Sequence, residues 1–203
     1  MASRWASLKQ ALNRLKRCQK FLTTLFAIRE QRTYAGGMQL KPHDLVVTLK
    51  LLIAGPLTYD QLAASLHLSK SEAHAAVKRA KAAGLLRADR QPIHHAILEF
   101  VLHGVRYAFP AVRGRQAQGM PTAHAAPPLS DLIHAGLDPI PVWPDAEGEA
   151  RGESFQPLYR SAPAASRSDP NLYRCLCLID ALRGGRARER NLATEHLTRL
   201  IHG

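Results

Sequence analysis

Apolar residues recur at three- and four-residue steps along much of the chain, which predicts a mainly helical fold. The first such stripe lies among basic side chains in residues 4–33, and Gly36-Gly37 ends it. We therefore predict a long, basic amphipathic helix over residues 1–37, which is either an arm of the protein or an extension upstream of Met38. Three roles stay open for it: packing against a partner or lying solvated, contacting a nucleic-acid backbone, and acting as a transit-type or membrane-surface helix.

The clearest helical pattern lies in residues 38–108. Pro42 suits the first turn of a helix whose apolar stripe runs up to Gly55-Pro56, where the helix stops. Thr58 then provides a suitable N-cap for a short helix of residues 59–66. The region therefore begins with two helices separated by a tight turn.

A longer helix follows the short one after a turn at His67-Leu68. Ser69 caps this helix of residues 69–84, and Glu72, three residues later, completes a capping box. An extended piece with a tight basic turn over residues 87–92 comes next. Residues 93–108 are apolar on much of their surface, which predicts a buried helix.

The second half of the chain contains a proline-rich region followed by a helical one. Nine of the thirteen prolines fall in residues 109–168, so long helices are excluded over most of this Pro-rich region. Residues 140–143 and 153–159 are predicted to form a small β-hairpin, with the prolines restricting both to edge strands. Asp169 as N-cap and Pro170 after it then start a C-terminal helical pair over residues 169–203.

The positive charge is concentrated in the first half of the chain. The formal net charge is +12, and it divides into +7 for residues 1–38, +4 for residues 39–95 and +1 for residues 96–203. Such a balance favours partners with negative charge, namely nucleic acid, an anionic membrane or an acidic protein. The sequence contains no run of 18 apolar residues that would predict a membrane-spanning helix, so we expect no membrane partner.

The cysteines and histidines indicate neither a disulfide framework nor a metal centre. The chain has three cysteines, Cys18, Cys175 and Cys177. Their odd number and wide separation favour a reducing, cytoplasmic compartment. The histidine clusters lack the spacing with cysteine of a tetrahedral zinc site: His94-His95 with His103, and His124 with His134. No nucleotide-binding, nucleophile or metalloprotease motif is present, so we expect no metal, no cofactor and no enzyme.

Residues 57–86 resemble the helix-turn-helix of winged-helix transcription regulators such as the MarR and ArsR families. The resemblance covers about residues 42–95 and is carried by four pieces at the expected spacings: Leu62-Ala63, Leu68-Ser69-Lys70-Ser71, Lys78-Arg79 and Gly84-Leu85-Leu86. Three residues depart from the pattern: His67 stands where Gly is usual, Ala73 where Val or Ile is usual, and Ala75 where an Arg often faces DNA. The resemblance implies a winged helix-turn-helix fold that binds DNA.

The same residues support DNA binding on physical grounds. A short and a longer helix joined by three residues cross steeply, so that the second projects and enters a major groove with its N-terminal half. A capped helix N-terminus with exposed donors also suits a phosphate. The predicted contacts lie at the caps, on the solvent side of the longer helix and on the basic turn: Thr58, Ser69, Lys70, Ser71, His74, Lys78, Arg79, Lys81, Arg87 and Arg90.

Two hypotheses from different classes follow. In the first, the protein is a transcription regulator, a dimeric repressor that reads double-stranded DNA with the helix of residues 69–84. In the second, it is a protein-interaction module, such as an antitoxin or a regulatory subunit, that holds a partner through residues 106–203. The two are compatible, since an antitoxin can repress its own operon. The alternative to both is that the basic residues form an ordinary solvated surface with no binding role.

Overall fold

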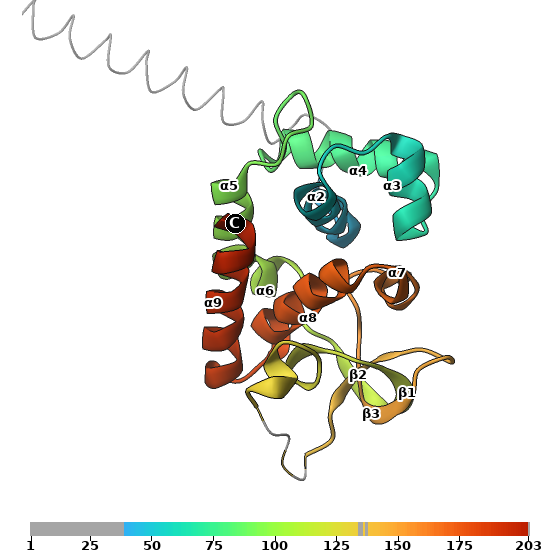
Figure 1. The fold of residues 1–203 in the computed structure, drawn as a ribbon, viewed down its shortest axis with the longest axis vertical. Helices are drawn as coiled ribbons and strands as arrows, with labels where there is room; N and C mark the ends of the chain where they lie inside the picture. Colours follow the sequence, from blue (N-terminus) through green and yellow to red (C-terminus); the bar gives the residue numbers. More distant parts are fainter. Residues whose placement is uncertain (1–38, 134–135, 137, 203) are drawn as a thin grey trace, which may run out of the picture. The chain divides into compact units, whose positions relative to one another are not determined.

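The computed structural model describes residues 39–133, 136 and 138–202, and the compact unit discussed below begins at Leu40. This unit is mainly helical and has one small three-stranded sheet, as the sequence predicts in outline (Figure 1). The helix predicted over residues 1–37 lies outside the described residues, and so does His134.

Three helices form the first part of the unit: α2 (Pro42–Ala54), α3 (Tyr59–Leu66) and α4 (Lys70–Ala82). Gly55 ends α2 with φ at 76°, a left-handed conformation that costs a glycine little, and α3 then leaves at a bend of 109°. Figure 1 shows α2 between α4 and α8. These three helices begin and end close to where the hydrophobic pattern predicts.

The basic turn after α4 is a tight reversal of the chain. Leu86 and Pro92 form an isolated antiparallel bridge, and the Arg87 N–H donates to the Gln91 carbonyl at 2.8 Å. The Ile93 N–H in turn donates to the Leu85 carbonyl at 2.9 Å. These bonds hold residues 85–93 as a short hairpin-like loop that projects beside α4 in Figure 1.

The segment predicted as a buried helix over residues 93–108 is helical, but only one of its faces is buried. It consists of α5 (His94–Glu99), a π-helical turn (Phe100–Gly104) and α6 (Val105–Ala108). Fully buried side chains recur at every fourth position, at Ile97, Val101 and Val105. The remaining apolar residues are only partly covered, because the segment packs at the edge of the unit against α8 and α9.

The Pro-rich region contains the sheet, formed by β1 (Arg113–Pro121), β2 (Pro141–Pro144) and β3 (Ala150–Phe155). The prediction of an antiparallel hairpin is wrong, because β2 and β3 pair in parallel. Both instead pair antiparallel with β1, a strand that the sequence did not predict. The three strands close on one another into a small barrel.

Two glycines permit this closure. A Cβ atom at Gly119 would lie 2.0 Å from the Trp143 carbonyl oxygen, and one at Gly152 would lie 2.0 Å from the Ile140 carbonyl oxygen. The backbones of the strands therefore approach so closely that only glycine fits at these positions. A pattern of apolar and polar residues does not reveal such contacts in advance.

The chain ends with α7 (Ala162–Ser168), α8 (Pro170–Gly184) and α9 (Ala187–His202). The predicted Asp169 cap is confirmed, since its Oδ1 accepts the N–H groups of Asn171 and Leu172 at 3.1 and 3.0 Å. Figure 1 shows α8 in the middle of the unit, with α2 on one side and the sheet on the other. For this reason its mid-section is buried on all sides, and its two cysteines with it.

One continuous core joins these parts. Side chains from α2, α3, α4, the sheet and α8 belong to a single buried cluster, so the regions 38–108, 109–168 and 169–203 are parts of one compact unit. Asp180 on α8 is a polar centre within it: its carboxylate accepts the Trp143 indole N–H at 2.6 Å and the Thr122 hydroxyl at 2.9 Å. Arg183 completes the group with an ion pair to the same carboxylate at 2.5 Å.

No single helix among the described residues combines the length and the apolar character needed to cross a membrane. The pair α2 and α3 meets these criteria only when its two members are taken together across their bend.

Candidate nucleic-acid interface

Two capping boxes set the positions of α3 and α4. The Gln61 N–H donates to the Thr58 hydroxyl at 3.2 Å, and the Thr58 N–H donates to the Gln61 side-chain oxygen at 2.8 Å. Ser69 and Glu72 form the same reciprocal pair at 3.2 and 2.9 Å. The capping predictions are confirmed, and both cap hydroxyls are used within their own helices.

The start of α4 is therefore already occupied by a carboxylate. Glu72 Oε2 accepts both the N–H and the hydroxyl of Ser69, and these hydrogen bonds lower the pKa of Glu72. An ionised side chain at this helix end takes the place that the sequence assigned to a phosphate. The expected phosphate site at the N-terminus of α4 is not supported, although Ser69 and the neighbouring Ser71 remain exposed.

The turn between α3 and α4 explains one departure from the winged-helix pattern. His67 has φ at 50° and ψ at 45°, the left-handed conformation for which Gly is usual. The Leu68 N–H closes the turn by donating to the Ala63 carbonyl at 2.9 Å. The chain thus keeps the conformation of the glycine turn with a histidine, at a cost of about 1–2 kcal/mol.

One face of α4 is buried and the opposite face is polar and exposed. The buried face is made almost entirely of small residues, Ala73, Ala76, Val77 and Ala80, and it packs against α2 and α3. The exposed face carries Ser71, His74 and Lys78, which share one side because they are three and four positions apart. The departure at Ala73 is thus a feature of the core and not of the exposed face.

The side chains around this face differ in how firmly they are held. The His74 ring packs on Tyr59 of α3 with the ring centroids 4.9 Å apart. Lys70 forms an ion pair with Asp60 at 2.9 Å, in which both side chains are largely exposed. A phosphate would compete easily with such a pair, because solvent-exposed ion pairs contribute little stability.

Arg79 is not part of the solvent-facing basic stripe in which the sequence placed it. Its guanidinium donates to both carboxylate oxygens of Asp44, from Nε and Nη2, each at 2.7 Å. The Asp44 side chain is fully buried and the Arg79 side chain is 14% exposed. The hydrogen bond to Asp44 raises the pKa of Arg79. Its role is to join α4 to α2, so we remove it from the set of DNA contacts.

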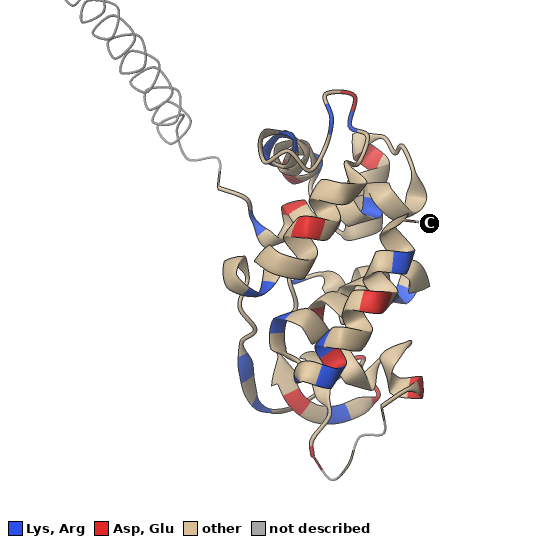
Figure 2. Ribbon diagram, turned by 90° about the vertical axis from the view of Figure 1, so that its left-hand side faces the viewer, with Lys and Arg blue, Asp and Glu red and all other residues tan. Residues whose placement is uncertain are grey.

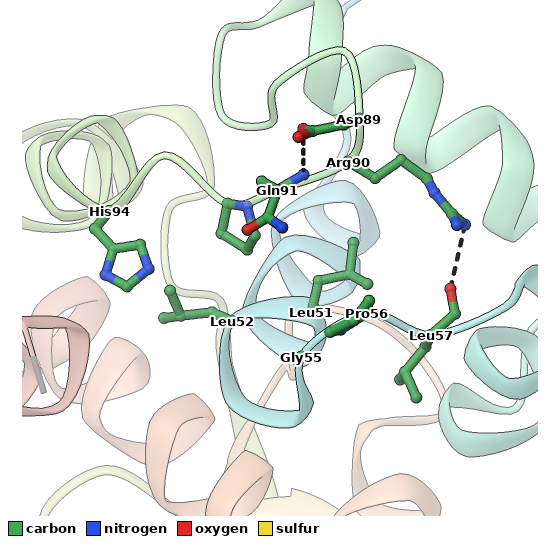
Figure 3. Close-up of a pocket in the computed structure, with 10 residues that line it drawn as sticks. Leu51, Leu52, Gly55, Pro56, Leu57, Asp89, Arg90, Gln91 and His94 are labelled. Atoms are coloured by element: carbon green, nitrogen blue, oxygen red, sulfur yellow. Dashed lines mark hydrogen bonds between the residues drawn. The ribbon is translucent and has the colours of Figure 1, made fainter.

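The basic turn is attached to the helices on both sides of it. Lys81 Nζ donates to the Ala88 carbonyl at 2.6 Å, from α4 to the tip of the turn. Arg90, with φ at 73°, donates to the Leu57 carbonyl at 3.2 Å, and its guanidinium lies 5.0 Å from the centre of the Tyr59 ring. Figure 3 shows the Arg90 side chain directed at Leu57 across a small hollow of about 150 Å³. Among the cations of the turn, Arg87 is exposed and Arg90 is half-buried.

Few of the predicted contacts on α4 and the basic turn are both exposed and uncommitted. Figure 2 shows Lys and Arg positions together with Asp and Glu positions spread over the described unit. The predicted contacts that the structure leaves exposed on α4 and its turn are Ser71, His74, Lys78 and Arg87, with Lys70 available once it leaves Asp60. Thr58, Ser69, Lys81 and Arg90 are committed to holding the motif together.

The histidines play no visible metal role in the described part of the chain. No group of three or more His, Cys, Asp or Glu side chains within it is arranged to hold a metal ion. His94 has a structural role instead, since its Nδ1 lies 2.7 Å from the Ile201 carbonyl and ties α5 to the end of α9.

Comparisons of this chain with protein families, with curated proteins and with solved structures found no match. The likeness to winged-helix regulators therefore depends on the residues and geometry given above.

Sequence reasoning missed two properties of this interface. The Arg79–Asp44 pair joins residues 35 positions apart, and nothing in the local pattern separates Arg79 from its exposed neighbour Lys78. The occupation of the α4 N-terminus by Glu72 was foreseeable, because the capping box that predicts the helix start also places a carboxylate there.

Proposed function

We propose that the protein is a DNA-binding transcription regulator, a dimeric repressor in which α4 enters the major groove of double-stranded DNA. The observation that carries this proposal is the exposed face of Ser71, His74 and Lys78 on a helix anchored from behind by its alanine face and by Arg79. A major groove admits one helix, and hydroxyl, imidazole and ammonium groups all hydrogen-bond to base edges or phosphates.

The basic turn supports the same proposal. Arg87 lies exposed at a turn that Lys81 fixes to α4, and Arg90 of the same turn donates to the Leu57 carbonyl just before α3 and lies over the Tyr59 ring of α3. In the proposed complex Arg87 contacts the phosphate backbone or the minor groove while α4 lies in the major groove, as in winged helix-turn-helix domains. Two copies would place their α4 helices about one DNA turn apart and so require a palindromic site.

The test is a fluorescence-anisotropy titration of the full chain with its own upstream DNA and with a scrambled DNA, at two salt concentrations. Lys78→Ala should weaken binding and reduce the salt slope by about one, because one phosphate contact is lost. The matched control is Arg199→Ala, which removes one positive charge from α9, where the side chain is 75% exposed. Equal weakening by both variants, or equal binding of the two DNAs, contradicts the proposal.

A second candidate function, the protein-interaction module, is favoured by one observation. The large apolar side chains that stay exposed in the described unit, Tyr107, Val112 and Leu132, all lie in the region to which the sequence assigned a partner. Tyr107 is 75% exposed and stacks only with its neighbour Arg106. Aromatic and Arg side chains are frequent anchors of protein interfaces. Co-purification of the tagged chain with a neighbouring gene product, lost in Tyr107→Ser, would support this function.

A further inference from the structure

A polar cavity of about 410 Å³ lies between the sheet and the start of α9. Figure 1 shows these elements at the end of the unit opposite α4. β1 contributes Arg113 and Gln116 to its wall, and β3 contributes Glu153. Arg186 and Glu189 line it from the start of α9. Its volume falls within the range of about 300–1,000 Å³ that is typical of sites for small molecules.

The inner wall of the cavity holds a histidine next to a carboxylate. His124 Nδ1 lies 3.5 Å from Glu189 Oε2, and the two side chains are only 17% and 11% exposed. The residue before His124, Ala123, has φ at 50°, which is unfavourable for a residue other than glycine. Strained backbone of this kind tends to occur where a functional group is held in place.

Arginines pair with two of the three carboxylates among the described residues that line the cavity. Arg113 pairs with Glu153, and Arg186 pairs with Asp138 at 2.8 Å. Within the described residues, Glu189 is therefore the cavity-lining carboxylate that has no arginine partner. It accepts the Arg186 backbone N–H at 3.1 Å, and it is the least exposed acid of the set.

This arrangement suits an organic cation better than a metal ion. A bound metal needs about four ligands, whereas two of the three carboxylates here already face arginines. An alkylammonium group needs only a carboxylate and one or two further acceptors, and a buried carboxylate attracts it more strongly than an exposed one. Glu189 provides the charge from α9, and Gln116, which lines the cavity from β1, has a side-chain oxygen that can accept a hydrogen bond.

We propose that this cavity binds a small alkylammonium compound, with the ammonium group at Glu189 and His124. Two sources share this chemistry, a diamine and a basic amino acid. They differ in the carboxylate, which Arg186 at the cavity mouth can receive when its exposed pair with Asp138 opens. The proposal does not depend on DNA binding, because no residue of the α4 face or the basic turn lines the cavity.

The test is isothermal titration calorimetry of the full chain with putrescine and with L-lysine at matched ionic strength. 1,4-Butanediol serves as the uncharged control compound. We expect saturable binding of at least one of the two amines, with a Kd below about 1 mM, and no binding of the diol. Stronger binding of L-lysine identifies an amino acid as the ligand class, and stronger binding of putrescine identifies a diamine.

Two variants test the assigned carboxylate. Glu189→Gln keeps the acceptor for the Arg186 N–H and removes the charge, so binding should weaken at least roughly tenfold. Gln116→Arg leaves Glu189 untouched and adds a cation to the wall, so it should weaken binding similarly even if Glu189→Gln folds poorly. Glu195→Gln, on the exposed side of the same helix, is the matched control and should bind as the unmodified chain does.

The proposal is overturned if neither amine gives saturable binding. It is also overturned if Gln116→Arg and a folded Glu189→Gln, with unchanged circular dichroism, both bind as tightly as the Glu195→Gln control. Equal binding of the diol and the amines would likewise contradict a role for the charge.

Discussion

Replacing Arg79 should destabilise the protein far more than replacing Lys70, although both residues lie on α4 and form short ion pairs. The Arg79–Asp44 pair has two contacts of 2.7 Å between side chains that are 14% and 0% exposed. The Lys70 Nζ lies 2.9 Å from each carboxylate oxygen of Asp60, and the two side chains are 65% and 70% exposed. Burial is thus the main difference between the two pairs.

The magnitude follows from what each variant leaves behind. Arg79→Met strands the Asp44 carboxylate in the core, which costs about 3–5 kcal/mol of unfolding free energy. The Lys41 N–H at 2.7 Å remains as a donor but brings no charge. His43 also lies beside Asp44, with its Nε2 3.5 Å from Oδ1, and burial lowers its pKa and so opposes its charging. Lys70→Ala should cost about 0–1 kcal/mol, as is usual for exposed pairs.

The assay is urea unfolding at pH 7, followed by far-UV circular dichroism and by the fluorescence of the chain, whose Trp143 is fully buried. The double variant Asp44→Asn with Arg79→Met should recover much of the loss, because it removes the stranded charge. A loss below about 1 kcal/mol for Arg79→Met, together with loss of DNA binding, would refute the structural role and return Arg79 to the set of DNA contacts.

Three further predictions concern the rest of the unit. Asp169→Asn should lower the unfolding free energy at pH 7 by about 1–3 kcal/mol, because it weakens the α8 cap and the 2.6 Å pair with Lys50. Burial alone would raise the pKa of Asp169, but the hydrogen bonds from Lys50 and the α8 backbone lower it overall. The difference in unfolding free energy between the variant and the unmodified chain should therefore shrink in urea titrations below about pH 4, where the carboxylate becomes protonated. Cys175 and Cys177 should resist iodoacetamide at pH 8 until the protein unfolds, because burial raises the pKa of Cys175 to about 12 and that of Cys177 well above its usual value. Peptide mass spectrometry of the treated protein measures this. A chain that starts at Met38 should keep a single cooperative thermal transition, since the described residues from Leu40 onward form a compact unit with its own core, and aggregation would show otherwise.

Local signals in the sequence were sufficient for α2, α3, α4, α8 and α9, whereas α7 in the Pro-rich region was not predicted. Ser69 with Glu72 and Thr58 with Gln61 satisfy backbone donors of the helices that they begin. Asp169 accepts two N–H groups at the start of α8, where Pro170 has no N–H that needs a partner. These interactions span three residues at most, so the sequence shows both partners at once. For the same reason the exposed face of α4 could be predicted from its alanine-rich opposite face.

The sheet and the ion pairs required the structure because their partners are distant in sequence. The closure of the sheet depends on Gly119 approaching Trp143 and on Gly152 approaching Ile140, and a glycine is equally at home in a loop. Arg79 differs from Lys78 only in pointing toward α2, and its partner Asp44 belongs to a different helix. Hydrophobic periodicity gives the side of a helix that is buried, but not the partner of a charged residue at its border.

The removal of Arg79 from the interface strengthens the case for a dimer within the proposed function. One copy of the described unit presents Ser71, His74, Lys78 and Arg87, with Lys70 in reserve, and Ala75 and Ala82 contribute no polar group to the same helix. Each good base contact contributes about 1–3 kcal/mol of discrimination between base pairs. One copy with this small number of groups therefore has little sequence specificity. Two linked copies convert the second contact into an intramolecular step and multiply the affinities. If this protein is a repressor, its affinity for a palindromic site should fall steeply for a half-site, and sedimentation of the complex should give two chains per site.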